Sequence, residues 1–372
     1  MSQPLYAAID VGGTKIAAAL VDAGGTLLTR SELPTPPKGS GEEVMATVAK
    51  LVAALAEDER WTEVAGLGIG SAGPVDPVRG TVSPVNIPGW RDFPLVNRVR
   101  ELEALGEIGV VGPEADSQPN VVLVGDGCAM AAGEHWRGAA RGYDNALCLV
   151  VSTGVGAGLI LDGALRSGPS GNAGHLGHIS VDIEGEDCPC GSRGCVEIIA
   201  SGTSIARWAV QHGWRVQADN VVHTFSHAPE GNADADLRAA DARTARGAGT
   251  MTATATASAP ATTNLAPVIT AADIAASARE GNEIALAAFD RAGRALAAGI
   301  AATAMLADIR AAVIGGGVAK AGDVLFDPLR RHLVRYASLP FTQGLDILPA
   351  TLGGDAGLIG AAALAAQADR LS

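Results

Sequence analysis

The stretch Tyr6-Ala-Ala-Ile-Asp10-Val-Gly-Gly-Thr-Lys15-Ile-Ala-Ala-Ala-Leu-Val21 decides the fold of this chain. An apolar segment ends in a carboxylate, two glycines turn the chain, and a second apolar segment returns. Gly24-Gly25 predicts a further hairpin turn, so residues 5 to 31 are expected to form three strands joined by two turns. Because a helix is predicted over residues 44 to 55 and a buried strand over residues 64 to 69, this part belongs to the mixed α/β class.

The turn after Asp10 has the composition of a phosphate-binding loop. Glycines at 12 and 13 leave no Cβ in the way of backbone N–H groups that approach a phosphate. Thr14 supplies a hydroxyl and Lys15 a cation. Asp10 at a strand end suits Mg²⁺, which keeps much of its hydration. A plain hairpin also uses Gly-Gly, so this motif needs support from elsewhere in the chain.

Two more glycine-rich loops follow apolar segments that are expected to be strands. Ser152-Thr-Gly-Val-Gly-Ala-Gly158 comes after residues 147 to 151, and Gly315-Gly-Gly-Val318 comes after residues 311 to 314. One such loop is weak evidence, but three loops at strand ends together predict a nucleotide site.

One imidazole and three thiols lie close together in the chain, at His178, Cys188, Cys190 and Cys195. Four N and S ligands are what a closed tetrahedral zinc site requires. Gly191 and Gly194 would let the backbone fold tightly around a metal. The alternative is a set of scattered buried cysteines beside an ordinary histidine.

Composition excludes several classes of protein. The chain has 372 residues, enough for two domains, and only 3% of them are aromatic, so Ala, Val, Leu and Ile must build the core. A net charge of −13 argues against a nucleic-acid surface. We find no signal peptide and no apolar run of about 20 residues, the length of a membrane span. Cysteine usage argues against a disulfide framework, so we expect a cytoplasmic protein without nucleic-acid or membrane partners.

These motifs resemble those of the ROK family of sugar kinases and sugar-responsive repressors, and the resemblance covers almost the whole chain. Further matching segments are Gly68-Ile-Gly-Ser-Ala-Gly-Pro-Val-Asp76, Asn86-Ile-Pro-Gly-Trp90 and Gly171-Asn-Ala-Gly-His175-Leu-Gly-His178. The resemblance implies an α/β, actin-like ATPase (ribonuclease H-like) fold, with two domains around a central ligand cleft. It also implies ATP and Mg²⁺, a structural Zn²⁺, a small-molecule sugar as substrate, and a homodimer.

The resemblance assigns roles to residues of this chain. The implied sugar-binding set is Ala72, Gly73, Asn86, His175, His178 and Glu197. The implied ATP and Mg²⁺ set is Asp10, Gly12, Gly13, Thr14, Lys15, Thr153, Gly154, Gly156, Gly315, Gly316 and Gly317. The implied zinc ligands are His178, Cys188, Cys190 and Cys195.

Asp126 is the predicted catalytic residue, because the family has an aspartate here that acts as general base toward the sugar hydroxyl. The family pattern is Asn-Asp-Ala-Asn, whereas this chain has Gly125-Asp126-Gly127-Cys128, so both flanking asparagines are lost. A carboxylate of ordinary pKa is a weak base toward an alcohol, but in a loose phosphoryl-transfer transition state the proton can leave late. The alternative is an aspartate that caps a helix beginning near Cys128.

His175 guides the choice of sugar. Most kinases of the family have Glu-x-Gly-His where this chain has His175-Leu-Gly-His178, a form that resembles bacterial N-acetylmannosamine kinases. A glutamate only accepts hydrogen bonds, whereas a neutral histidine can also donate one to the carbonyl of a 2-acetamido group. We therefore expect ATP-dependent phosphorylation of a sugar 6-hydroxyl. N-Acetylmannosamine is the first choice, and N-acetylglucosamine and glucose are the alternatives.

Two other classes of protein stay open. A sugar-sensing repressor would carry a helix-turn-helix before the Asp10 motif, and the short segment ahead of Asp10 leaves no room for one. A catalytically degenerate sugar-binding protein would account for Gly125 and Cys128.

We expect an N-terminal domain over residues 1–124, with a helix over about 358–372 packed back on it, and a larger C-terminal domain over 125–357. Residues 103–120 are expected to form a surface loop. Residues 217–267 are expected to form an extended insertion, because their composition cannot bury enough apolar area to offset chain ordering. Structure should resume with a helix capped by Thr270. The next helix, after Glu283, is expected to carry an apolar face of Ile284, Leu286, Ala287 and Phe289.

Overall fold

The computed structural model describes residues 4–36, 40–84, 87–108, 120–215 and 269–369, and two five-stranded sheets dominate it. The N-terminal sheet has the order β3 (Leu27–Pro34), β2 (Lys15–Asp22), β1 (Leu5–Val11), β4 (Val64–Ser71) and β7 (Val121–Gly125). Strands β3, β2 and β1 are antiparallel to one another in turn, whereas β1, β4 and β7 run parallel. The three strands predicted near the N-terminus are confirmed.

The C-terminal sheet repeats this arrangement. Its order is β10 (Ala164–Leu165), β9 (Val155–Leu161), β8 (Ala146–Val151), β11 (Ala311–Gly315) and β12 (Asp346–Pro349). Antiparallel pairing again joins the first three strands and parallel pairing the last three. A short antiparallel pair, β5 (Val75–Asp76) with β6 (Thr81–Val82), lies between β4 and β7 in the chain.

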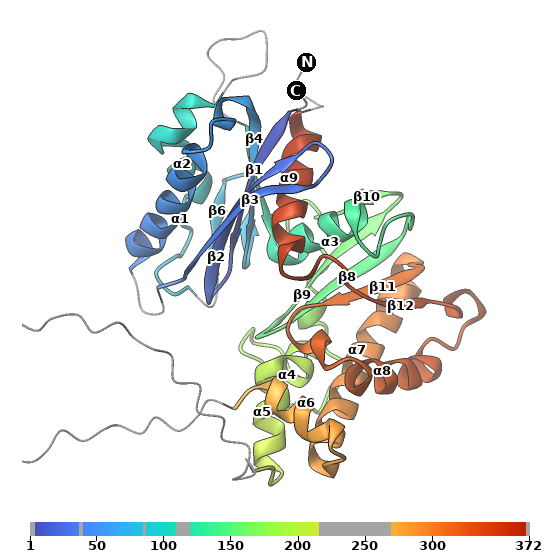
Figure 1. Cartoon of the computed structure of the whole chain (residues 1–372). Coiled ribbons are helices and arrows are strands. Elements are labelled where there is room, and N and C mark those ends of the chain that lie inside the picture. Colours follow the sequence, from blue (N-terminus) through green and yellow to red (C-terminus); the bar gives the residue numbers. More distant parts are fainter. Residues whose placement is uncertain (1–3, 37–39, 85–86, 109–119, 216–268, 370–372) are drawn as a thin grey trace, which may run out of the picture. The chain divides into compact units, whose positions relative to one another are not determined.

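The helices of the described ranges cover these sheets (Figure 1). They are α1 (Gly41–Ala56), α2 (Leu95–Arg100), α3 (Asp126–Arg137), α4 (Val196–Ala200), α5 (Gly202–Gln211), α6 (Ala271–Arg279), α7 (Glu283–Ala307), α8 (Asp323–Tyr336) and α9 (Ala356–Asp369). At the start of α6, the backbone N–H of Thr270 donates to Asp273, so the predicted cap is confirmed. None of the described helices is both long and apolar enough to cross a lipid bilayer.

Two helices cover opposite faces of the N-terminal sheet. Alternate residues of a strand point to opposite faces, so Ala7 and Ile9 pack in the cluster that includes α1, whereas Tyr6 and Ala8 pack against Leu358 and other residues of α9. Helix α9 therefore returns the C-terminal end of the chain to the first sheet. The division into domains at residues 124 and 125 stays a prediction.

Helices α3 and α9 contact each other through backbone. A Cβ on Gly360 of α9 would overlap the Ala129 carbonyl of α3, and a Cβ on Gly133 of α3 would overlap the Ala356 carbonyl of α9. Only glycine fits at such close crossings. Helix α3 follows β7 of the N-terminal sheet and precedes β8 of the C-terminal sheet, so α9 packs against the helix that connects the two sheets along the chain.

The predicted apolar face of α7 is wrong in part. Leu286 is 44% exposed and Ala287 is also exposed, whereas the buried face is made largely of alanines with Phe289. Small residues let the backbones of α7 and α8 approach, and a Cβ on Gly293 would lie 2.8 Å from the Leu329 nitrogen of α8. Close packing, not side-chain size, decides which face is buried.

The prediction of a surface loop over residues 103–120 is wrong for its first part. Glu103–Glu107 form a 3₁₀ helix, and Leu105 is fully buried in the core of the N-terminal sheet. The indole N–H of Trp61 donates to the Ala104 carbonyl at 2.8 Å, which anchors the turn. Residues 109–119 and the predicted insertion 217–267 lie outside the described residues.

Candidate active site

Asp10 lies near the end of β1, beside the second predicted carboxylate, Asp126. Burial and then the negative charge of Asp126 raise the pKa of Asp10 to about 6, although Lys15 and Arg30 act in the opposite direction. The first turn of α9 lies against this carboxylate, because a Cβ on Gly357 would come 2.8 Å from Oδ2. The Asp10 carboxylate accepts no hydrogen bond from the described residues, which suits a group that binds a hydrated cation.

The turn from Gly12 to Lys15 is a tight, anchored loop. The Gly12 N–H donates to the Lys15 carbonyl at 3.0 Å, and the Thr35 hydroxyl donates to the Gly12 carbonyl at 2.7 Å. Gly13 is half-buried and Thr14 is exposed. The Lys15 ammonium pairs with Glu32 of β3 at 3.1 Å, and about half of its side chain is exposed. The structure therefore leaves the Thr14 side chain exposed at this turn, whereas Lys15 is paired with a carboxylate.

Asp126 is the first residue of α3, directly after β7, and Gly125 is the N-cap. The idea that Asp126 caps a helix starting near Cys128 is wrong, because α3 already begins at Asp126. The Asp126 carboxylate accepts the N–H of Gly127, within the first turn, at 2.7 Å. Burial raises the pKa of Asp126, and the nearby His175 and the Gly127 N–H lower it. A Cβ on Gly156 would lie 3.3 Å from Oδ1, so β9 backbone passes close to this carboxylate.

The loop after β8 is held by a carboxylate from another element. Glu197 of α4 accepts the Val155 N–H at 2.8 Å through Oε2, and a Cβ on Gly154 would lie 2.6 Å from that oxygen. The Thr203 hydroxyl donates to the Thr153 carbonyl at 3.0 Å. Glu197 therefore shapes the glycine loop as well as facing His178, whose Nε2 lies 4.0 Å from Oε1.

The loop after β11 approaches the same place. Gly316 has a positive φ of 88°, and a Cβ there would overlap the Val151 carbonyl at the end of β8. A Cβ on Gly317 would lie 3.8 Å from the Ser152 hydroxyl oxygen. Gly315, at the end of β11, pairs with Val150 of β8. The glycine loops that follow β8 and β11 thus come together, as the sequence predicted.

The predicted zinc ligands converge. One ligand atom from each of His178, Cys188, Cys190 and Cys195 lies within 4.8 Å of the others. The Cys190 and Cys195 sulfurs are 3.7 Å apart, close to the about 3.8 Å that two Zn–S bonds of 2.3 Å span in a tetrahedron. His178 presents Nδ1, which lies 3.9 Å from the Cys188 sulfur. The donor set and its spacing therefore fit a four-coordinate zinc ion.

Glycines allow the tight turns around this cluster, and arginine ion pairs hold the loop in place. Gly191 and Gly194 both have positive φ, and a Cβ on Gly194 would overlap the Asp182 carbonyl. Glu186 accepts from Arg207 at 2.8 Å and from Arg291 at 3.0 Å, which ties the zinc loop to α5 and α7. Burial raises the pKa of Cys188 to about 12, whereas the Ser192 N–H lowers that of Cys190.

His175 lies beside the loop that follows β4. Its Nδ1 is 2.8 Å from the Asn172 carbonyl, and since a carbonyl only accepts, the proton of a neutral ring sits on Nδ1. Nε2 is then an acceptor, and a Cβ on Gly73 would lie 3.5 Å from it. In this arrangement a neutral His175 ring presents an acceptor at Nε2, and the expected donation to an acetamido carbonyl stays a prediction.

The remaining predicted sugar residues are placed in part. Ala72 is buried, and its N–H donates to the Val11 carbonyl at 3.0 Å, which sets the Ala72–Gly73 loop beside the end of β1. Asn86 lies outside the described residues. Sequence reasoning missed Asn172, whose side chain bonds both the N–H and the carbonyl of Val75 and whose own carbonyl orients His175. Its place between two turn glycines was the available signal.

Comparisons with known proteins agree with these observations. A family model described as "ROK family" matches residues 6–262 and 255–368. The glucokinase of Thermotoga maritima is 30% identical over 96% of this chain and 95% of that enzyme. The N-acetylmannosamine kinase of Yersinia pseudotuberculosis is 38% identical over 61% of this chain and 71% of that enzyme.

A solved structure shows the same architecture. It is a ROK family glucokinase from Streptomyces griseus in complex with glucose and AMPPNP, 32% identical, with a TM-score of 0.70 over 98% of this chain and 99% of that one. The predicted actin-like ATPase fold of the α/β class is thereby confirmed.

Proposed function

The chain belongs to the ROK family, and we propose that it is an ATP-dependent kinase that phosphorylates the 6-hydroxyl of a hexose. One observation carries the proposal: Asp126, the first residue of α3, lies next to the backbone of Gly156, and its carboxylate interacts electrostatically with Asp10 and His175. A carboxylate that can accept a proton, a glycine-rich loop and a second carboxylate thus lie close together. Phosphoryl transfer to an alcohol needs these three elements.

Asp126 is the proposed general base. Its raised pKa, caused by burial, makes it a stronger base than an exposed aspartate. It would accept a hydrogen bond from the sugar hydroxyl, orient the oxygen for attack, and take the proton as the phosphoryl group arrives. The Gly127 N–H keeps the carboxylate turned in one direction.

Asp10 and the glycine loops are the proposed phosphate side of the site. Asp10 would hold Mg²⁺ through water, and the ion would neutralise charge on the phosphates of ATP. The backbone at Gly13 and Thr14 and the loop at Thr153 and Gly154 would donate N–H groups to the phosphates, whereas the Gly12 N–H holds the turn through the Lys15 carbonyl. Gly315, Gly316 and Gly317 would lie by the adenosine. Lys15 must leave Glu32 to contribute its charge.

The zinc ion is proposed to be structural. Four protein ligands leave no open position for a reactive water. Binding of the metal by Nδ1 of His178 keeps the ring proton on Nε2, which makes this nitrogen a donor. The rings of His175 and His178 lie 6.4 Å apart, so the sugar would meet one acceptor and one donor side by side.

We infer that glucose is the first acceptor to test. Nε2 of His175 accepts, as a glutamate would, so the argument that placed N-acetylmannosamine first no longer separates it from glucose. N-Acetylmannosamine stays the second candidate, because the relative that phosphorylates it is 38% identical over 228 residues. An acetamido N–H could also donate to His175.

A coupled assay of ADP release over glucose, N-acetylglucosamine and N-acetylmannosamine tests the proposal. We expect turnover with at least one sugar, highest kcat/KM with glucose, and a 6-phosphate product identified by NMR. Sugar binding without turnover on any of the three would instead favour a sugar-binding protein. Preference for N-acetylmannosamine would leave the kinase assignment standing and reject the glucose choice.

A homodimer and a cytoplasmic location are also proposed. The homodimer rests on the family resemblance. The location is supported by five free cysteines, as expected in a reducing compartment. Analytical ultracentrifugation tests the first of these proposals.

A further inference from the structure

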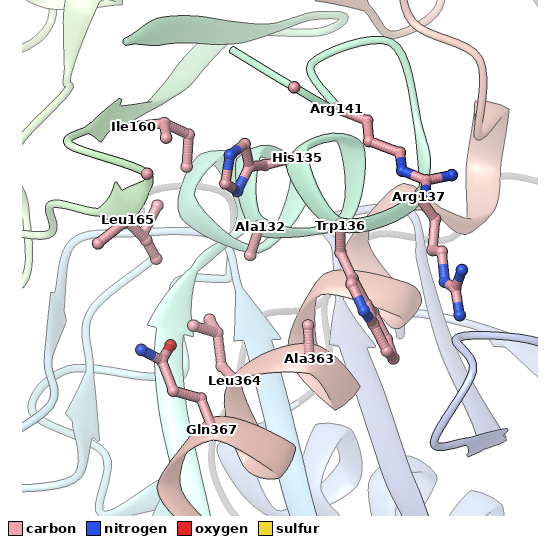
Figure 2. A pocket seen from close by; sticks show the side chains of 13 residues that line it. Ala132, His135, Trp136, Arg137, Arg141, Ile160, Leu165, Ala363, Leu364 and Gln367 are labelled. Carbon is pink, nitrogen blue, oxygen red and sulfur yellow. The ribbon is translucent and has the colours of Figure 1, made fainter. Parts of the chain in front are cut away.

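A cavity of about 660 Å³ lies along the last half of α3, away from Asp126. It is formed by α3, the last turns of α9, and the β9–β10 hairpin with the turn after α3 (Figure 2). Asp126 is the first residue of α3 and Arg137 the last, so at 1.5 Å per residue they are about 16 Å apart along the helix axis. The cavity is therefore separate from the candidate active site, and its size is typical of small-molecule sites.

The charged side chains that line this cavity are Arg137 and Arg141, and the imidazole of His135 lies beside them in the lining. In the part of the chain that the structure describes, none of the three has an ion pair or a side-chain hydrogen bond. Two described carboxylates lie near the cavity. The Asp144 carboxylate lies close to Gly163, which belongs to the lining. The Asp22 carboxylate lies close to Gly24, beside Arg137, but it accepts the Thr26 N–H at 2.8 Å. Although the chain has a net charge of −13, the described residues provide neither Arg137 nor Arg141 with a carboxylate partner.

The rest of the lining is largely apolar. Ile160 and Leu165 lie at one end of the cavity and the two arginines at the other, with Trp136 beside the arginines (Figure 2). The guanidinium carbon of Arg137 lies 5.1 Å from the centroid of the Trp136 ring, which restricts where the guanidinium points. A ligand that fits both ends carries an anionic group on a less polar body.

We propose that this cavity binds a small phosphomonoester, with the phosphate held by Arg137 and Arg141 and the body directed toward Leu165. Planar guanidinium groups bind phosphate oxygens through paired N–H donors, and they stay charged at every physiological pH. The side chains of Leu364 and Gln367 project from α9 toward α3 (Figure 2), and the Gln367 amide supplies a donor and an acceptor for ligand hydroxyls.

Such a ligand contacts the C-terminal sheet and a helix that packs on the N-terminal sheet. Helix α9 packs on the N-terminal sheet, whereas the β9–β10 hairpin belongs to the C-terminal sheet. Helix α3 lies between these walls and carries Asp126 at its other end. A bound phosphomonoester therefore restrains the two sheets relative to α3 and changes turnover. This consequence rests on the proposed kinase function, whereas binding itself does not.

Isothermal titration of the full chain, with its active site filled by AMPPNP and glucose, tests the site. The probes are glucose 6-phosphate, AMP, inorganic phosphate and citrate. We expect one or both phosphomonoesters to bind, and the double variant Arg137→Gln/Arg141→Gln to weaken that binding at least tenfold. Arg335→Gln, an exposed arginine on α8, is the matched control and should bind as the wild type does.

The comparison of probes identifies the source of the phosphate. Tighter binding of glucose 6-phosphate assigns the site to a sugar phosphate, and tighter binding of AMP assigns it to a nucleotide. Equal binding of citrate, no binding of either phosphomonoester, or unchanged binding by the double variant would each overturn the proposal. The double variant should keep wild-type turnover without ligand and lose the response to it; an unchanged response would overturn the coupling.

The outcome separates this proposal from the kinase assignment. Arginine-dependent binding in a protein that phosphorylates no sugar would retain the site and reject the proposed function. Turnover without any such binding would do the reverse.

Discussion

The two sheets share one topology but contribute different chemistry. Strand β1 with its turn corresponds to β8 with its turn, and each is followed by an antiparallel and flanked by a parallel neighbour. In the N-terminal sheet the strand itself carries the carboxylate, Asp10, one residue before its last pair with β2. In the C-terminal sheet the matching residue is Val150, and a carboxylate arrives from α4 as Glu197.

The difference shows how one backbone pattern serves two tasks. The N-terminal sheet ends in acidic side chains at Asp10 and, after β7, at Asp126. The C-terminal sheet contributes mainly backbone groups and the zinc loop, and one oxygen of Glu197 already accepts the Val155 N–H. We therefore expect changes in the first set to alter turnover and changes in the second set to alter substrate affinity.

The largest expected effect comes from Asp126→Asn. Removing a general base lowers kcat by about 10²-fold or more, with the sugar KM little changed. Steady-state kinetics and circular dichroism measure turnover and folding together. Asp308→Asn, at an exposed left-handed helix end, is the control and should be active. Near wild-type turnover of folded Asp126→Asn would remove the asymmetry between the sheets.

Asp10→Asn should make the protein more stable at neutral pH while it lowers activity. The pKa of Asp10 is raised from 3.8 to about 6, so the folded state loses stability as pH rises from about 4 to 6. At pH 7 the charged, buried group costs about 3 kcal/mol at most. In urea unfolding without added Mg²⁺, the variant should have a higher free energy of unfolding than the wild type at pH 7 and the same free energy near pH 4. A constant difference at both pH values would contradict the shift.

Cys190→Ser tests the other half of the comparison. Loss of one zinc ligand should release the metal and raise the sugar KM about tenfold or more, since His178 loses its orientation. The zinc content, by mass spectrometry, and the sugar KM are measured on the same preparation of the variant. Arg193→Gln changes the same loop at an exposed ion pair with Asp187 and should keep both. A zinc-free variant with wild-type KM would separate the metal from the sugar site.

His175→Glu should have a modest effect. Both side chains present an acceptor toward Gly73, so kcat/KM for glucose should change less than about fivefold, the worth of roughly one hydrogen bond. His175→Leu, which has no acceptor, should cost more. If His175→Glu lost glucose activity as completely as His175→Leu, the ring would be acting as a donor, contrary to its bond with Asn172.

Gly125→Asn should have the smallest effect. A Cβ at Gly125 meets nothing within 4 Å, and its φ of −66° suits any residue. Asparagine at this N-cap should stabilise the fold by a few tenths of a kcal/mol relative to glycine. Gly127→Asn is the contrasting variant, because a Cβ there would lie 2.6 Å from Ala157 backbone. Thermal unfolding should rank Gly125→Asn at or above wild type and Gly127→Asn well below.

The sequence by itself determined the features that depend on neighbours in the chain. The strands and turns of residues 5 to 31 follow from alternating apolar runs and paired glycines, and the zinc ligands follow from four soft donors in one short segment. Local spacing predicts both because few residues separate the groups that interact. The role of Asp126 was available only through the family resemblance.

Only the tertiary structure decided the features that depend on distant contacts. Asp10 of β1 and Asp126 of α3 lie far apart in the chain, and their pKa values rise because packing removes water from both. The buried face of α7 follows from how closely α8 approaches. The proton of His175 is placed by the Asn172 carbonyl, and the cationic cavity exists because α9 returns to pack beside α3. Desolvation and hydrogen-bond geometry arise from packing, which no local pattern encodes.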